Sequence, residues 1–249
     1  MKIIRFEHKG KQAWGTVHDT TIQLLAGDIF AGATETEERA PLAEVRILPP
    51  GWPSKIVGVG LNYRERFVGK ESQIPLSPEV FFRPPSSIIG HMDHIVFPEN
   101  VEELGYEAEL GVVIGKRAKN VPENQALDYV LGYTVVNDAT VRDYLKKGIR
   151  SPLAKCHDTT CPFGPVIATG LNPDNLNLET RLNGKTVESS NTRNLIFKSA
   201  YLVSYLSKMM TLMPGDLIPT GAPGAGPMKR GDTVEIEIEG IGTLINFVS

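Results

Sequence analysis

The chain has almost no cysteine, and this excludes a fold held together by disulfides. Cys156 and Cys161 are the only cysteines among 249 residues. They are too few for a disulfide framework, and the second pair that a structural zinc site needs is missing. An apolar run of the roughly 20 residues that cross a membrane is also missing, so no membrane partner is expected. These absences favour a protein of the reducing cytoplasm.

An excess of positive charge is missing as well. The 26 Lys and Arg residues face 29 Asp and Glu residues, which gives a net charge of −3. Without a basic field to hold a phosphate backbone, nucleic acid is not expected as a partner. A dinucleotide fingerprint is absent too, because Gly58-Val59-Gly60 lacks the third glycine and a following helix. What remains is an ordinary globular composition, 41% hydrophobic, in a chain long enough to bury a core.

Short strand patterns separated by turn residues dominate the chain. Pro49 and Pro50 cannot lie inside a helix or a central strand, so we place a boundary near residue 50. A small β-rich N-terminal domain, residues 1–50, is expected to precede the main domain, residues 51–249. The Asn183-Gly184 pair predicts a hairpin turn. Apolar periodicity predicts one helix over 192–208 and buried strands over 55–60, 80–82, 108–114 and 129–136.

Two carboxylates stand at the start of one of these apolar strands. Because side chains alternate along a strand, Glu107 and Glu109 share one face while Ala108 points the other way. Neighbouring carboxylates repel each other unless a cation lies between them, and hard oxygen donors favour Mg²⁺ or Mn²⁺. Asp138, which follows another apolar strand, is the candidate third ligand. An exposed polar strand face is the alternative that the spacing leaves open.

Cationic residues near these acids indicate an anionic substrate. Arg142 follows Asp138 by four residues, and Lys155 lies in a polar loop. We expect Arg142 to clamp a substrate carboxylate, and Lys155 to donate to a developing enolate or to exchange a proton. Ordinary surface salt bridges are the alternative for both. Three histidines are candidate proton carriers or hydrogen-bonded structural residues: His91, His94 and His157.

Four separated blocks resemble the fumarylacetoacetate hydrolase family. They are KIVGVGLNY at 55–63, YEAELGVVIGK at 106–116, GYTVVND at 132–138 with Arg142-Asp143, and LMPGDLIPTGAP at 212–223. The resemblance implies a mixed β-roll, so the expected fold class is β-rich α+β, and it implies a homodimer. It also implies Mg²⁺ or Mn²⁺ held by Glu107, Glu109 and Asp138. The residues that it implies for the substrate are Arg142, Lys155, Asp158, Thr220 and Gly221.

Several positions depart from the family pattern. Hydrolytic members usually carry a His, and three residues later a Glu, just after the Asn-Tyr of the first block. Here these positions are Arg66 and Gly69, and neither side chain activates water near neutral pH. Glu65 and His91 are candidates for replacing the pair. Two further departures bear on substrate binding: Arg83-Pro84 where Lys-Pro is usual, and Ala222 where Thr is usual.

The segment AKCHDTTCPFGP at 154–165 is most similar to one branch of the family. That branch isomerises and decarboxylates ring-opened diacids of homoprotocatechuate breakdown, such as 2-hydroxyhepta-2,4-diene-1,7-dioate. We therefore expect a metal-dependent isomerase/decarboxylase, a lyase that acts on a small anionic 2-oxo dicarboxylic acid through an enolate. An acylpyruvate-type C–C hydrolase of the same fold is the alternative. A non-catalytic member that binds an oxo acid is the second alternative.

Overall fold

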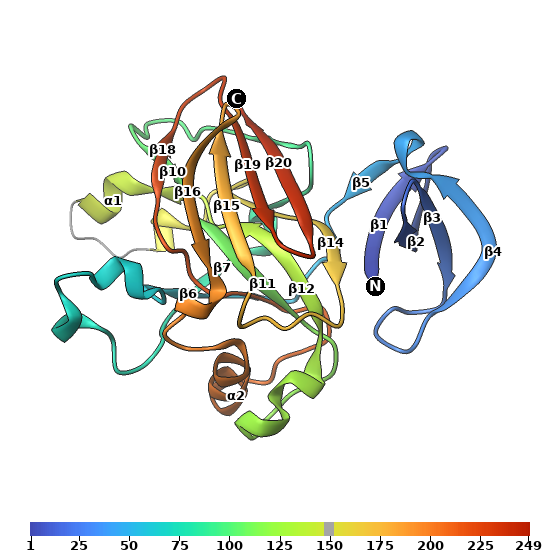
Figure 1. Ribbon diagram of the computed structural model, residues 1–249. Coiled ribbons are helices and arrows are strands. Elements are labelled where there is room, and N and C mark those ends of the chain that lie inside the picture. The colour runs from blue at the N-terminus through green and yellow to red at the C-terminus, as the bar shows by residue number, and fades with distance from the viewer. Residues whose placement is uncertain (147–151) are drawn as a thin grey trace.

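The computed structural model describes residues 1–146 and 152–249. Strands dominate this part of the chain, and its α-helices are α1 (Arg142–Lys146) and α2 (Ser199–Met209). None of the described helices is long and apolar enough to cross a membrane. Figure 1 shows the first strands as a lobe on one side of a larger body, which contains the remaining strands and α2.

The largest sheet has 12 strands, and ten of them follow one path of hydrogen-bonded neighbours. In spatial order these are β4 (Thr34–Pro41), β3 (Thr21–Ala26), β2 (Lys11–His18), β1 (Lys2–His8), β14 (Cys161–Ala168), β12 (Val130–Asn137), β11 (Ala108–Ile114), β17 (Leu217–Pro219), β6 (Ile56–Gly60) and β7 (Glu79–Arg83). Two short strands branch from this path, β5 (Arg46–Leu48) beside β1 and β8 (Ile88–Ile89) beside β14.

Two smaller sheets complete the described strands. The first, of three strands, contains β13 (Thr140–Val141), β10 (Leu104–Tyr106) and β18 (Gly226–Met228). The second, of five, contains β16 (Lys185–Asn191), β15 (Asn177–Leu182), β19 (Thr233–Ile238), β20 (Gly242–Val248) and β9 (His94–Ile95). Most pairs are antiparallel, but β17 with β6, β14 with β8 and β20 with β9 are parallel. Mixed sheets with few helices confirm the expected β-rich α+β class.

One apolar core joins the large sheet, the five-stranded sheet and α2. Every residue of β11 is buried, as expected for a central strand with neighbours on both sides. Leu110 of β11, Ile236 of β19 and Leu202 of α2 are almost completely buried in the same cluster. The loops at the ends of β11, β12 and β17 therefore rest on a rigid base.

The expected strands are present, whereas the expected helix begins later than Thr192. Residues Thr192–Asn194 form a short 3₁₀ turn, and α2 starts only at Ser199. The buried Asn62 side chain accepts a hydrogen bond from the Phe197 amide at 2.8 Å and donates to the Phe197 carbonyl at 2.9 Å. These bonds keep the backbone before Ser199 extended, and Lys198 is in the β region. A contact distant in sequence therefore overrides the local helical pattern.

The first fifty residues extend the large sheet. β1 pairs with β14 in antiparallel register, with Lys2 opposite Ala168 and Ile3 opposite Ile167. The domain boundary near residue 50 remains a prediction, since sheet hydrogen bonds link the two sides of it.

The predicted hairpin at Asn183-Gly184 is confirmed, with φ of 52° and 75° at the two turn residues.

Candidate metal centre

Three acidic side chains meet beside the paired ends of β11 and β12. Ala108 lies opposite Asn137 in this antiparallel pair, and the Asp138 amide donates to the Glu107 carbonyl at 2.9 Å. One carboxylate oxygen from each of Glu107, Glu109 and Asp138 lies within 4.8 Å of the others. Glu109 is 2% exposed and Asp138 is fully buried. An exposed polar strand face is therefore wrong as an interpretation of this pattern.

The loop after β17 supports Glu109 from the other side of β11. The Gly221 amide donates to Glu109 Oε2 at 2.7 Å. Gly221 has a φ of +103°, and a Cβ there would lie 2.7 Å from the Cβ of Asn62, so the position requires glycine. Thr220 is buried, and its hydroxyl donates to the Leu110 carbonyl at 2.9 Å. In the structure, both of these residues hold the strand ends and Glu109 in place.

Two cations from distant segments contact the acidic triad, by which we mean Glu107, Glu109 and Asp138. The Lys155 ammonium lies 2.8 Å from Glu107 Oε2 and also pairs with Asp138. Arg83, at the end of β7, is completely buried along its side chain and pairs with Asp138. Arg83 also donates to the Lys155 carbonyl at 2.8 Å. Arg83 thus positions both an acid and the lysine, a role that its sequence context did not reveal.

The charges of the site shift the acidities of its members in different directions. Burial, together with the nearby Asp138 and Glu107, raises the pKa of Glu109 well above its usual range. Burial would also raise the pKa of Asp138, but Arg83 and Lys155 outweigh it and the pKa is lowered. For Lys155, burial is outweighed by Asp138 and Glu107, so its pKa is raised and the ammonium stays protonated at neutral pH.

These observations fit a divalent cation. Asp138 and Glu107 have cationic partners, whereas the only hydrogen bond described for the buried Glu109 carboxylate comes from the Gly221 amide. The three carboxylates, when all ionised, are balanced by Lys155, Arg83 and Arg66, whose Nη2 lies 3.8 Å from Glu107 Oε1. Hard oxygen donors of this kind suit Mg²⁺ or Mn²⁺. A bound divalent ion would leave the site net positive, which favours an anionic ligand.

A cavity of about 970 Å³ opens onto the acidic triad. The Lys155 ammonium also lies 4.8 Å from the centroid of the Phe81 ring, within the range of a cation–π contact. The cavity therefore combines one charged end with apolar walls, as suits a small organic anion. Besides the triad, the residues that line the cavity include Val59, Arg66, Val80, Phe81, Arg83, Lys155 and Ala222.

Arg66 lies on the short 3₁₀ turn that follows Asn62 and Tyr63, residues 64–67. Its Nε donates to the Ala222 carbonyl at 2.9 Å, and its Nη2 donates to the Gly224 carbonyl at 2.7 Å. Nη2 also lies 3.8 Å from Glu107 Oε1. The departure from the family pattern therefore places a permanent positive charge beside the triad, at the position where hydrolytic members usually carry a His.

The other residues named from sequence lie elsewhere. Arg142 Nε is 3.0 Å from Glu103 Oε1, and Asp158 is exposed in a turn. His91 accepts a hydrogen bond from the Ile245 amide at 3.2 Å. Glu65 accepts from the side chains of Ser190 and Asn194, both at 2.5 Å. None of these four is among the residues described as lining the 970 Å³ cavity.

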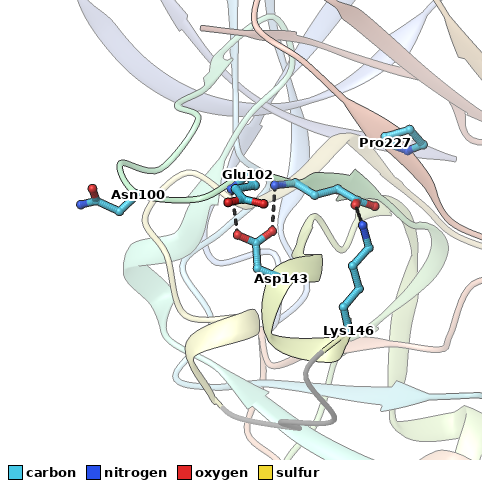
Figure 2. A pocket seen from close by; sticks show the side chains of 6 residues that line it. Asn100, Glu102, Asp143, Lys146 and Pro227 are labelled. Atoms are coloured by element: carbon cyan, nitrogen blue, oxygen red, sulfur yellow. Dashed lines mark hydrogen bonds and ion pairs between the residues drawn. The ribbon is translucent and has the colours of Figure 1, made fainter.

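Glu103, the partner of Arg142, lines a second hollow, whose other lining residues include Asp143 and Lys146 (Figure 2). Glu103 there pairs with both Arg142 and Lys146, and the amides of Glu102 and Glu103 donate to Asp143 at 2.8 Å. This hollow has a volume of about 550 Å³. The carboxylates of Glu103 and Asp143 are already bonded to neighbours, so we place no ligand in it.

Glu188 is an acidic residue of the site region that the sequence did not indicate. It lies on β16, where its neighbours in sequence are exposed. Its Oε2 is buried without a hydrogen-bond partner, and a Cβ on Gly224 would lie 1.9 Å from its Oε1. Burial raises the pKa of Glu188 to about 7; Arg66 opposes this, while Glu107 and Glu65 add to it.

Glu188→Gln should stabilise the protein at alkaline pH. The folded state holds the proton up to about pH 7 while the unfolded chain releases it near its ordinary pKa of about 4.3, so stability falls as pH rises between these values. Solvent at the partly exposed Glu188 screens the cost of its negative charge. We therefore expect the substitution to raise the free energy of unfolding by about 1–2 kcal/mol at pH 8 and by almost nothing at pH 4. Urea unfolding at both pH values measures it. Glu37→Gln, at an exposed residue, is the control, and an equal gain at both pH values would contradict the assignment.

A carboxylate triad surrounded by cations, in a cavity at the ends of central strands of a mixed sheet, could hold a metal ion beside a small organic anion. Residues 55–249 match the fumarylacetoacetate (FAA) hydrolase C-terminal family, and residues 1–50 match the Rv2993c-like N-terminal family. The chain therefore belongs to the fumarylacetoacetate hydrolase family.

Named relatives span several activities. A crystal structure of 2-hydroxyhepta-2,4-diene-1,7-dioate isomerase from Mycobacterium marinum is 38% identical, with a TM-score of 0.91 over 100% of this chain and 98% of that one. Oxaloacetate tautomerase FAHD2B, a mitochondrial protein of Homo sapiens, is 40% identical over 222 residues, 84% of this chain and 71% of that protein. Maleylpyruvate hydrolase from Sphingobium sp. SYK-6, solved with manganese (II) ion and pyruvate, is 27% identical, with a TM-score of 0.83 over 100% of this chain and 98% of that one. These relatives support an enzyme.

Proposed function

We propose that the protein is a divalent-metal-dependent isomerase/decarboxylase of a small 2-oxo dicarboxylic acid. The substrate class is that of the 2-hydroxy-dienoic acids formed when aromatic compounds such as homoprotocatechuate and 4-hydroxyphenylacetate are broken down. The observation that carries the proposal is the convergence of Glu107, Glu109 and Asp138 with the protonated Lys155 in one cavity. A homodimer and a cytoplasmic location remain predictions.

Glu107, Glu109 and Asp138 would hold Mg²⁺ or Mn²⁺. Such a cation, when bound, supplies Lewis-acid stabilisation of negative charge on a substrate oxygen. Lys155 keeps a proton at Nζ within the cavity, since Asp138 and Glu107 raise its pKa. In the direction from enolate to ketone it delivers this proton to the enolate carbon, and in the reverse direction the neutral amine takes it back. Arg83 orients Lys155 and Asp138 through its bonds to both.

The relatives support proton transfer next to a carbonyl as the shared chemistry. The isomerase and the tautomerase both move a proton between carbon and oxygen, and neither name implies water as a reactant. An acylpyruvate-type C–C hydrolase is the alternative, and the similarity to maleylpyruvate hydrolase favours it. Hydrolysis needs a base to activate water, and the positions where hydrolytic members usually carry it are Arg66 and Gly69 here. We therefore propose isomerisation and decarboxylation ahead of hydrolysis.

The test is a spectrophotometric assay with and without a chelator. We expect the ultraviolet band of 2-hydroxyhepta-2,4-diene-1,7-dioate to change at least about tenfold more slowly after EDTA treatment, and Mn²⁺ to restore the rate, because the chelator removes the Lewis acid that would stabilise negative charge on the substrate oxygen. Equal rates with and without EDTA would contradict the proposal. Incorporation of ¹⁸O from water into a cleaved product would favour the hydrolase. Thermal stabilisation by 2-oxo acids without any turnover would indicate a non-catalytic binder.

A further inference from the structure

We propose that Arg66 selects substrates that carry a second carboxylate group. This inference rests on the proposed function and names a specificity residue for it. Arg66 lies on the wall of the cavity that opens onto the acidic triad. Hydrogen bonds to neighbouring backbone carbonyls hold its guanidinium. It would take over the recognition of the distal carboxylate, which the sequence had suggested for Arg142.

The guanidinium of Arg66 is held in one orientation. Two backbone carbonyls, those of Ala222 and Gly224, accept hydrogen bonds from its Nε and Nη2 at 2.9 Å and 2.7 Å. Both carbonyls belong to the loop that follows β17, the same loop whose Gly221 amide contacts Glu109. The direction of the Arg66 guanidinium is thus set by backbone atoms of this loop.

Arg66 also retains donors for a ligand. A guanidinium has five N–H groups, and the described bonds of Arg66 use Nε and Nη2 but not Nη1. The Glu107 oxygen at 3.8 Å from Nη2 is too distant to be a hydrogen-bond acceptor. The side chain is 24% exposed, so an anion can reach it. The N–H groups left over form the fork that binds a carboxylate in a bidentate manner.

The other cations of the described cavity lining are committed to the triad. Arg83 has a fully buried side chain and bonds to Asp138, to Thr160 and to two backbone carbonyls. The Lys155 ammonium bonds to Glu107 and Asp138. Among the described residues that line the cavity, Arg66 is therefore the arginine with N–H groups left to bind a second substrate carboxylate. The 2-oxo carboxylate end would lie toward the triad and Lys155.

The test compares acids that differ only in the distal carboxylate. Exchange of the C3 protons with deuterium, followed by NMR, reports enolisation of 2-oxoglutarate and of 2-oxopentanoate in the Mn²⁺-loaded enzyme. We expect Arg66→Met to lower kcat/KM for 2-oxoglutarate by about a hundredfold, the loss of a charge-assisted bidentate contact, and to leave 2-oxopentanoate within about twofold. Arg66→Lys keeps the charge without the fork, so its loss should be about tenfold on the diacid only.

Controls separate this role from a structural one. Arg64→Met removes an exposed arginine of the same turn and should change neither acid. The melting temperature and the Mn²⁺ affinity of Arg66→Lys should be similar to those of wild type. Because Arg66→Lys keeps the positive charge, it serves as the test variant if Arg66→Met does not fold. Equal losses on both acids, or no loss on the diacid, would overturn the inference and leave the proposed function standing. If wild type exchanges neither acid, the inference fails, and the proposed function is then decided by the assay on 2-hydroxyhepta-2,4-diene-1,7-dioate.

Discussion

Glu109→Gln is expected to lower kcat/KM by about a thousandfold or more. The amide has nearly the volume of the carboxylate and keeps an oxygen for the Gly221 amide, so the packing around β11 should survive. It removes one of the three negative charges that would hold the cation, and a loss of about 4 kcal/mol in transition-state stabilisation corresponds to about a thousandfold in rate. The activity should therefore collapse in a protein that is still folded.

Two measurements check the cause of this loss. Titration with Mn²⁺, followed by electron paramagnetic resonance, should show much weaker binding to Glu109→Gln than to wild type. The metal-free variant should be at least as stable as metal-free wild type at neutral pH, because burial and neighbouring acids raise the pKa of Glu109 and disfavour its charge. Glu237→Gln, in a salt bridge on β19 remote from the triad, is the matched control. Full activity in Glu109→Gln would refute the metal centre.

Lys155→Met is expected to lower kcat by about a hundredfold to ten-thousandfold while it leaves Mn²⁺ binding intact. General acid–base residues contribute about this much to the rate. The substitution removes the ammonium that contacts Glu107 and Asp138, so both carboxylates stay free to bind a cation. A large loss of kcat without a loss of metal affinity is the pattern that separates a proton donor from a ligand.

The same substitution elsewhere provides the comparison. Lys116→Met, at an exposed lysine just after β11, should have no effect on kcat or on Mn²⁺ binding. Deuterium exchange at C3 of 2-oxoglutarate should slow in Lys155→Met in proportion to turnover, since the proton on Nζ enters both processes. Unchanged exchange, or a parallel loss of metal affinity, would show that Lys155 only balances charge.

Local sequence patterns were enough for the strands and for the acidic triad. Alternation along a strand places Glu107 and Glu109 on one face whatever the strand pairs with. The prediction for Asp138 also held in space, because it follows the strand that pairs with β11. The Asn183-Gly184 turn is equally local, since few residues other than these tolerate its positive φ angles. These features depend on the geometry of a few consecutive residues.

Contacts between distant segments decided the rest. The side chain of Asn62 delays the start of α2 to Ser199, although the apolar period begins earlier. Arg142, four residues from Asp138 in sequence, bonds to Glu103 instead of lining the cavity, whereas Arg83 reaches Asp138 from 55 residues away.

By itself, the sequence determined the class of fold, the family and the acids that gather around one point, since each of these follows from spacing and pattern along the chain. Only the tertiary structure decided which cations face those acids, that Arg66 lies on the cavity wall, and that the half-buried Glu188 lies close to Arg66. A long, flexible cationic side chain reaches several partners from one Cα position, and the packing of distant strands and loops selects among them.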